Sequence, residues 1–349
     1  MFCHQSLIFS MNPYRFLCLL MFGFVSMTGA FATAGTPSTK ARQLYKEGLA
    51  LRSNGQLPAA ISRFSAAIYL YQPFTDAYLQ LGDIYRIQQQ PEKAVTQYQA
   101  VLECQPGHIY ALRGLAAVYY DQHAYEQALT YALQVRAQGV SGESLRIGQC
   151  YAALHDSMSA QDALKMACAE MPGNSEPPCL LARLYASGGN FAASIYYFQQ
   201  AIRIDSTQSQ LYYEAGKIYF NINDYTKAIQ YYEHAAALGL PLHTAYHYNL
   251  AMACLKLEQT AKGIKMLEVA LSLHPEDIPA IYLLAHTYYT RQEFKEAIVQ
   301  WNLLLSLQPE NAFALFMLGK SYIGAGNVDK GIALCDRALS ANSSVPASM

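Results

Sequence analysis

Two histidines have the spacing of a possible metal site. His243 and His247 are four residues apart, so on a helix both imidazole rings would face the same side, where they could bind zinc. The zinc-protease pattern also requires a glutamate directly after the first histidine, and Thr244 occupies that position. His247 moreover stands where a large packing residue recurs along the chain. We therefore expect no metal at this pair.

The tripeptide Gly319-Lys320-Ser321 looks like the end of a phosphate-binding loop. Such a loop needs another glycine five residues upstream, where this chain has Ala314. The surrounding stretch has helical periodicity and follows no predicted strand. No GxSxG or GxGxxG motif occurs in a strand-turn-helix context, and the acidic residues are scattered rather than paired. We therefore expect no cofactor and no catalytic residues, and the chain is predicted not to be an enzyme.

Six of the eight cysteines follow residue 34, and none has the CxxC spacing of a zinc or redox site. Cys168 and Cys179 flank the sequence MPGNSEPP, the strongest helix-breaking cluster in the chain. One interpretation is that they face each other across this break and form a disulfide. The other is that both are small buried residues, which is how free cysteine usually behaves. The sequence leaves both interpretations open.

The elements that carry these residues are predicted to be short paired helices, as residues 278–311 show most clearly. Large apolar residues such as Ile281 and Leu284 recur at spacings of three and four, which gives one apolar helix face. Three polar residues interrupt this pattern, and it resumes around Trp301. Pro309 ends it, because proline has no amide hydrogen and disfavours helix in the residue before it. Each such stretch predicts two antiparallel helices.

A very small residue recurs once in each predicted helix, where the two helices of a hairpin would cross closely. In both series the step is 34 or 35 residues, except for steps of 32 and 31 after the fourth member. Two series that stay in step over nine units predict a true repeat. The first-helix series is Gly48, Gly82, Ala116, Cys150, Ala182, Gly216, Ala251, Ala285 and Gly319. The second-helix series is Ala60, Ala94, Ala128, Ala163, Ser194, Ala228, Gly263, Ala297 and Gly331.

A 34-residue helix-turn-helix period resembles the tetratricopeptide repeat (TPR) family. The family pattern is nearly complete in residues 75–108, as Tyr78, Leu81-Gly82, Tyr85, Ala94, Tyr98, Val101 and Pro106. The resemblance covers residues 41–345. It implies an all-α fold, a right-handed α-solenoid of about nine helix-turn-helix units, in which each unit packs only on its neighbours.

The resemblance divides the chain into a lead-in at 35–40, nine units and a tail at 346–349. The units are predicted at 41–74, 75–108, 109–142, 143–174, 175–208, 209–242, 244–277, 278–311 and 312–345. The fourth is the least regular: its turn gains one residue, and Ala167 replaces an aromatic such as Phe64 or Trp301. Residues 171–178 are therefore interpreted either as a drifted repeat junction or as a hinge between 41–170 and 175–345.

Composition narrows the possible partners. The formal net charge is -1, and no basic run or stripe is visible, so nucleic acid is not an expected partner. Apolar residues make up 52% and charged residues 14% of the chain, as suits a well-buried helical protein. Most of the 28 tyrosines fall in the repeat register, so the fold accounts for them.

Residues 1–34 are predicted to be a secretory signal peptide. Arg15 precedes the apolar run FLCLLMFGFVSMT, and small residues ending in Ala34 follow it, as a cleavage site requires. Met11 would give a more usual start than Met1. Cleavage near Ala34 predicts a periplasmic or secreted protein. The alternative is an uncleaved N-terminal helix that anchors the chain, the only case in which a membrane is an expected partner.

In TPR arrays the first helix of each unit lines the concave face, where ligands usually bind. The resemblance therefore places a partner-binding groove at residues three before, one after and four after the small residue of each first helix. From these we select Arg113, Tyr120, Tyr213, Lys217, Phe220, Tyr248, Met252, Tyr282, His286, Tyr289, Phe316 and Lys320. Aromatic rings with a few cations suit an extended peptide or an amphipathic helix. The tyrosines have a second interpretation, as packing residues between units.

Three functions remain open. The first is a non-catalytic scaffold that binds a protein or peptide segment on the concave face, outside the cytoplasm. The second is an accessory to a carbohydrate-processing or envelope-assembly enzyme complex, since tyrosine faces also stack on sugars. The third is a structural protein that self-associates through its C-terminal unit, because the polar tail is too short to be a capping helix.

Overall fold

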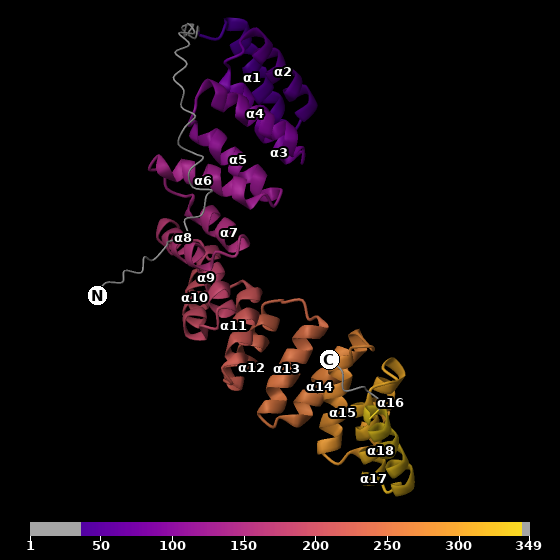
Figure 1. Ribbon diagram of the computed structural model, residues 1–349. Helices are drawn as coiled ribbons and strands as arrows, with labels where there is room; N and C mark the ends of the chain where they lie inside the picture. Colours follow the sequence, from indigo (N-terminus) through magenta and orange to yellow (C-terminus); the bar gives the residue numbers. More distant parts are fainter. Residues whose placement is uncertain (1–35, 344–349) are drawn as a thin grey trace, which may run out of the picture.

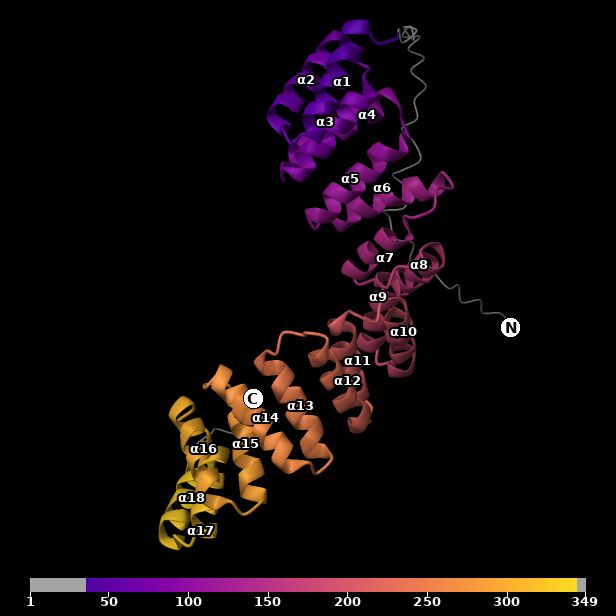
Figure 2. The same cartoon turned by 180° about the vertical axis from the view of Figure 1, so that it is seen from behind.

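The computed structural model describes residues 36–343, and in that range the chain forms eighteen α-helices and no strand. The helices follow one another as an elongated stack, with α1 at one end and α18 at the other (Figures 1 and 2). They are α1 Thr39–Ser53, α2 Leu57–Leu70, α3 Thr75–Ile87, α4 Pro91–Cys104, α5 Ile109–Asp121, α6 Tyr125–Ala137, α7 Ser144–Ala153, α8 Ser157–Glu170, α9 Glu176–Ser187, α10 Phe191–Ile204, α11 Ser209–Asn221, α12 Tyr225–Ala237, α13 Thr244–Lys256, α14 Thr260–Leu273, α15 Ile278–Thr290, α16 Phe294–Leu307, α17 Ala312–Gly324 and α18 Val328–Ser343. This confirms the predicted helical solenoid.

The helices form nine hairpins, α1–α2 to α17–α18, which we call units one to nine. Within every unit three residues join the helices, and the middle one has a positive φ. The amide of the third turn residue donates to a carbonyl in the last turn of the first helix at 2.8–2.9 Å, as Gln90 does to Tyr85. This is the left-handed C-cap that commonly ends a helix. Six of the nine middle residues are not glycine, so a glycine in the sequence does not identify most of these turns.

The small residues lie where the helices of a hairpin cross. A Cβ added to Gly82 would lie 2.6 Å from Cε1 of Tyr98, a ring that is fully buried. In unit nine the backbones come closer, because a Cβ at Gly319 would lie 2.7 Å from the carbonyl oxygen of Gly331. A side chain at either glycine would force the two helices apart. The steric reason for the repeated small residue is therefore correct.

The predicted register of unit four was wrong. In the eight other units the small residues lie seven before and five after the positive-φ residue, which in unit four is His155. The same spacing identifies Gly148 and Ala160, not Cys150 and Ala163. A Cβ at Gly148 would lie 2.6 Å from Cγ of Leu164, so Leu164 fills the slot assigned to Ala167. The error arose because cysteine and alanine are also small.

With the corrected register of unit four, the irregular junctions of the array lie at other places than predicted. The turn of unit four has the usual three residues, and the step from Ala160 to Ala182 of unit five is the usual 22 residues, although α9 begins one residue later than in a regular unit. The unusual junctions are residues 138–143, before α7, and 238–243, before α13. At the predicted hinge, the Ser175 hydroxyl accepts a 3.0 Å hydrogen bond from the Gln208 side chain. The hinge stays a prediction, without the register argument that suggested it.

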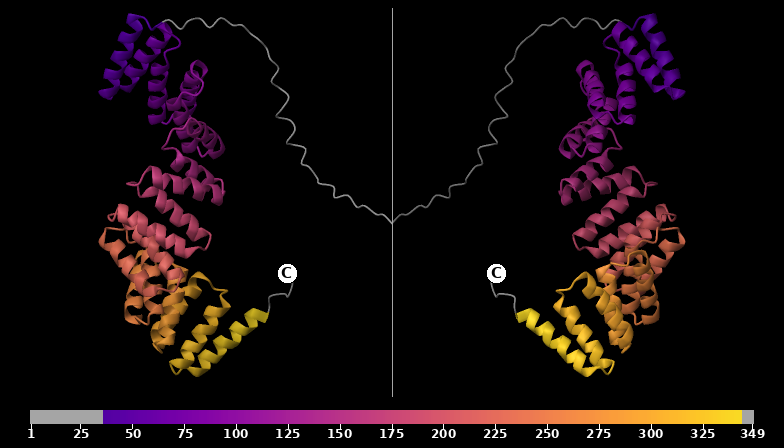
Figure 3. Two further views of the ribbon diagram at one scale, coloured as in Figure 1. Left: turned by 90° about the vertical axis from the view of Figure 1, so that its left-hand side faces the viewer. Right: turned by 90° about the vertical axis from the view of Figure 1, so that its right-hand side faces the viewer.

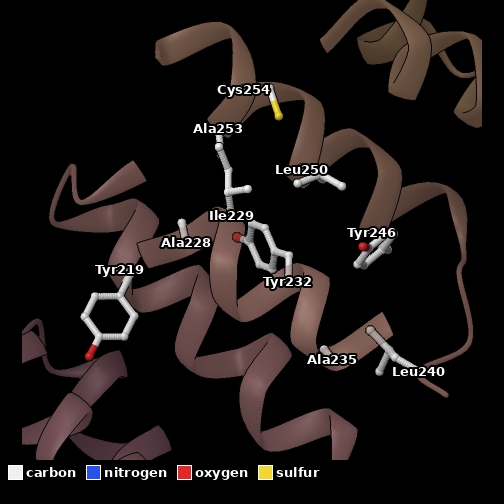
Figure 4. Packing of buried hydrophobic residues seen from close by; sticks show 10 residues of the cluster. All are labelled: Tyr219, Ala228, Ile229, Tyr232, Ala235, Leu240, Tyr246, Leu250, Ala253 and Cys254. Atoms are coloured by element: carbon white, nitrogen blue, oxygen red, sulfur yellow. The ribbon is translucent and has the colours of Figure 1, made fainter. Parts of the chain in front are cut away.

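The core fills each hairpin and continues between successive units. In the cluster of Figure 4, Tyr232 of α12 points into the space between α12 and α13, where Tyr246 and Leu250 meet it. Burial raises the pKa of the Tyr232 hydroxyl above its ordinary value of 10.0. The second helix of each unit therefore packs against the first helix of the next.

The array curves with its first helices on the inside. Successive first helices contact each other at α3–α5 and α7–α9, and no two second helices approach as closely. Side views show the resulting bend (Figure 3). Among the described residues no helix is long and apolar enough to cross a membrane. The predicted signal peptide, residues 1–34, lies outside the described range.

Candidate functional site

The candidate site is the inner face of the array, meaning the first-helix side chains that point to the inside of the curve. Between α9 and α11 this face is hollowed into a cleft of about 430 Å³. Arg183 and Lys217 both line the cleft. Positive charge therefore lies where a ligand would enter, and the availability of each cation decides what the face can bind.

Arg113, predicted as a binding residue, has a structural role. Its Nε donates to Glu143 Oε1 at 2.6 Å, and its Nη2 donates to the Ser141 carbonyl at 2.9 Å. Glu143 is only 6% exposed, so its carboxylate needs this partner. The contact ties α5 to the junction 138–143 before α7. Sequence reasoning missed it because Glu143 stands 30 residues away.

Two further inner-face arginines of the first five units, Arg52 and Arg183, are neutralised in the same way, whereas the exposed Arg86 forms no ion pair among the described residues. Arg52 pairs with Asp83 at 3.6 Å and also donates to Gln80. Arg183 holds Glu214 through two bonds of 2.7 and 2.8 Å. Burial would raise the pKa of the Glu214 carboxyl, but the bonds from Arg183 and Gln210 outweigh it, so the pKa is lowered. These guanidinium groups join neighbouring units.

Lys217 and Lys320 differ, because neither forms an ion pair in the described part of the chain and both are exposed. The Lys217 ammonium lies 6.0 Å from the centre of the Tyr213 ring. The Lys320 ammonium lies 5.6 Å from the Tyr289 ring and 5.8 Å from the Phe316 ring. Aromatic faces attract a cation without neutralising it, so both ammonium groups can still meet an anion.

The predicted aromatic residues of units eight and nine come together. Tyr282 stacks at 13° on His286 and meets Phe313 at a centroid distance of 5.8 Å. Tyr282 is 39% exposed and Phe313 is 49% exposed, so both offer area to a ligand. Phe316 also borders a cleft of about 510 Å³ at the end of the array. This cluster places two exposed rings side by side on the inner face.

The predicted residues of units six and seven pack more than they project. Tyr213 is half-buried, accepts a 2.8 Å hydrogen bond from Asn249 and lies 5.5 Å from the Tyr232 ring. Burial raises the pKa of Tyr213 and of Tyr248. Phe220 meets Tyr225 edge-on, and Met252 is half-buried. These contacts favour the packing interpretation of these tyrosines, since each exposes only part of its surface.

Tyr120 lies apart from the other predicted aromatics. Its ring meets Tyr125 edge-on at 5.6 Å and lies under the Arg146 guanidinium at 5.7 Å. Phe313, by contrast, was missed. It stands six residues before Gly319, one helical turn from the position of Phe316, and therefore on the same face. Including that earlier position would have found it.

The cysteine and histidine pairs do not converge. Cys168 and Cys179 are both free. Cys168 lines a pocket with Tyr197 on the second-helix side, whereas Cys179 is buried on the first-helix side among Phe198 and Leu211. The predicted disulfide is thus absent, because the two side chains point to opposite sides. His243 is exposed and His247 is buried, and no group of three metal-ligating side chains occurs among the described residues.

Comparison with solved structures supports the architecture. The C-terminal part of a TPR repeat-containing protein from Cytophaga hutchinsonii is 17% identical, with a TM-score of 0.62 over 69% of this chain and 99% of that one. A tetratricopeptide repeat protein from Parabacteroides merdae is 18% identical, with a TM-score of 0.52 over 72% of this chain and 99% of that one. At these identities the likeness shows the fold alone.

Two curated relatives match over only part of their own length. Anaphase-promoting complex subunit 6 of Arabidopsis thaliana is 26% identical over 184 residues, which is 50% of this chain and 34% of that protein. The peroxisomal targeting signal receptor of Saccharomyces cerevisiae is 26% identical over 244 residues, 66% of this chain and 39% of that protein. The chain therefore spans less than half the length of either relative.

Family models described as tetratricopeptide repeat match more than half of the chain. One model matches residues 45–109, 213–278 and 282–346, and a second matches 179–208. Together with the nine hairpins and their repeated small residues, these matches identify the chain as a member of the tetratricopeptide repeat family.

Proposed function

We propose that this protein is a non-catalytic scaffold that binds an extended, acidic and partly aromatic segment of another protein along the inner face of units six to nine. Lys217 and Lys320 meet carboxylates of the segment, and the exposed rings around Tyr282 and Phe313 supply contact area. An aromatic surface with isolated cations favours a segment that alternates acidic and large apolar side chains.

The observation that carries this proposal is the difference in charge pairing. Arg52, Arg113 and Arg183 are all held by carboxylates of the chain itself, so binding an anion there would require breaking an ion pair. Lys217 and Lys320 lie near aromatic rings and form no ion pair among the described residues, although the charge of Lys217 also acts on Glu214, which Arg183 already holds. An incoming carboxylate gains their charge without displacing another acid.

The curated relatives support the general class. One is named as a subunit of a complex and the other as a receptor for a targeting signal, and both functions depend on contacts with other proteins. We further propose that binding takes place outside the cytoplasm. This part rests on the signal-peptide pattern of residues 1–34 alone, and it is tested by determining the N-terminal residue of the protein from its source.

The binding proposal is tested with a displayed library of random peptides selected on the full chain. We expect the selected peptides to combine acidic and large apolar residues, and their affinity to fall at least about tenfold in the double variant Lys217→Glu, Lys320→Glu. The matched control is Lys265→Glu, Lys295→Glu. It changes the net charge equally, on exposed second-helix positions of α14 and α16.

Each alternative gives a different result. Selected peptides without acidic residues, or equal weakening by both double variants, would contradict the proposal. Binding of oligosaccharides instead of peptides, lost in Tyr282→Ala, would favour the carbohydrate-processing accessory. A concentration-dependent mass in sedimentation, with no peptide selected, would favour the self-associating structural protein.

A further inference from the structure

The second helix of every unit has an apolar face that the next unit covers, and α18 keeps this face although no described helix follows it. In α16, Trp301 and Leu304 are buried against Ala314 and Leu318 of α17. The residues one and eight positions after the small residue, Ile298 and Leu305, border the same contact and are half-buried. This contact provides a template for what can pack on a second helix.

In α18 the equivalent residues are exposed. Ile332 is 49% exposed and Leu339 is 61% exposed. None of the corresponding residues of the eight other second helices is exposed. Those residues are Ile61, Ile68, Val95, Leu102, Leu129, Arg136, Gln161, Cys168, Ile195, Ile202, Ile229, Ala236, Ile264, Leu271, Ile298 and Leu305. We call the exposed stripe of Val328, Ile332 and Leu339 the end face (α18, yellow in Figure 3).

The eight covered examples describe the occupant that this face fits. Each covering helix presents a stripe of small and large apolar residues, such as Ala280 and Leu284 of α15. Five positions after the small residue, the second helix also makes a recurrent polar contact with the next first helix. Gln199 donates to the Tyr219 hydroxyl at 3.2 Å, and Glu268 accepts from the Tyr288 hydroxyl at 2.9 Å. In α18 that position is Asp336, an exposed acid.

The first helix of a second copy does not fit the end face. Five and one positions before the small residue, seven of the eight other units carry buried apolar residues, whereas α1 has Gln43 and Glu47. Gln43 donates to Glu47 at 3.1 Å, and Glu47 also pairs with Arg63 at 3.4 Å. Burying this polar group against Ile332 and Leu339 would cost its hydration without offering it a partner. The two ends of the array are therefore chemically different, and head-to-tail stacking of copies is disfavoured.

We propose that the end face binds an amphipathic helix of a different protein, which takes the place of a tenth first helix. Its apolar stripe repeats the small and large spacing of α15, and a tyrosine hydroxyl or a cation on its border meets Asp336. The end face meets the inner face at the cleft that Phe316 and Leu339 both line, whereas Ile332 and Asp336 do not line that cleft.

The test uses a helix-stabilised, fluorescein-labelled peptide with the sequence of α15, Ile278–Thr290, added to the full chain. We expect saturable binding that weakens at least about tenfold in the double variant Ile332→Lys, Leu339→Lys. Val299→Lys is the matched control, because Val299 of α16 is also 61% exposed but lies away from the end face. A peptide with Leu284→Lys should bind at least about tenfold more weakly.

The two binding surfaces can fail separately. The variant Lys217→Glu, Lys320→Glu should bind the α15 peptide normally, since neither lysine belongs to the end face. No saturable binding, or binding that the Ile332 and Leu339 changes leave intact, would overturn the proposal. So would a dimer in sedimentation that dissociates in Leu339→Lys, because the face would then belong to a second copy. Circular dichroism should show equal helicity in all variants.

Discussion

The inner face of units one to five and that of units six to nine use positive charge differently. In the first half, Arg113 and Arg183 reach across to carboxylates of a neighbouring element and join units together. In the second half, Lys217 and Lys320 lie over aromatic rings and project into solvent. The guanidinium group suits the first role because its planar fork can bond a carboxylate at two points. The same register position can thus serve either cohesion or binding.

The largest expected effect is a loss of stability in the first half. Arg113→Ala leaves the buried Glu143 carboxylate without its main partner, so we expect the local free energy of opening around α7 to fall by about 2–3 kcal/mol. Lys217→Ala, which removes a cation without an acid partner, should change stability by less than about 0.5 kcal/mol. Hydrogen exchange of the α7 and α11 amides measures both. Equal losses in the two variants would remove the distinction between the halves.

Removing the acid partner of Arg183 should make this arginine available to a ligand. Glu214→Gln removes the charge that neutralises Arg183, so the cleft around Lys217 gains a second available cation. We expect the affinity for an acidic peptide selected on this protein to rise about three- to tenfold, or about 1 kcal/mol. Fluorescence anisotropy measures it. Glu103→Gln, an exposed carboxylate of α4, is the control and should change nothing. Weaker binding by Glu214→Gln would show that Arg183 needs its partner in order to be positioned.

Alkaline pH should modestly lower the free energy of unfolding of units six to nine. Burial, together with the hydrogen bond to Glu268, raises the pKa of Tyr288 from its ordinary value of 10.0 to about 12. The folded protein holds this proton more tightly than the unfolded chain, so the contribution is complete below pH 10 and is lost as the pH rises to 12. The expected effect is at most about 1 kcal/mol, because solvent screens the group. Thermal melts of the parent and Tyr288→Phe should converge over that interval, and parallel curves would contradict the assignment.

The smallest expected effect is none at all. Since Cys168 and Cys179 face opposite sides of the array, the intact mass of the purified protein should be the same before and after reduction. Burial raises the pKa of the Cys179 thiol to about 11, so alkylation at neutral pH should be slow there and fast at the exposed Cys104. A gain of two hydrogens on reduction, mapped to Cys168 and Cys179, would restore the disulfide interpretation.

The fold was predictable because every hairpin requires small residues at the same two positions, so these residues recur at a regular spacing in the sequence. Small residues such as Gly82 and Gly216 face large buried rings, and their spacing alone predicts the hairpins. In unit four the choice of crossing residues is ambiguous, since Gly148, Cys150, Ala160 and Ala163 are all small enough to stand where the two helices cross. The turn at His155 resolves the choice, but its left-handed backbone is visible only in the structure.

The candidate site was less predictable than the fold. Register placed Tyr282, Phe316 and Lys320 on one face correctly, because it follows from helical geometry. It could not show which cations are neutralised, since each acid that holds an arginine belongs to another element of the chain. Glu143 and Glu214 stand 30 and 31 residues from the arginines that they hold. Availability of a charged group is a property of the three-dimensional neighbourhood.

The junction at residues 238–243 has a consequence for ligand length. It is one of the two irregular connections, and it lies between the unit that carries Lys217 and the unit that carries Lys320. Each hairpin is rigidly defined by its own turn, so a residue inserted or removed here would alter the angle between two otherwise unchanged blocks. That angle sets the span between the two ammonium groups. Insertions or deletions in residues 238–243 would therefore change the spacing of the two acidic residues in a segment that can bind both lysines.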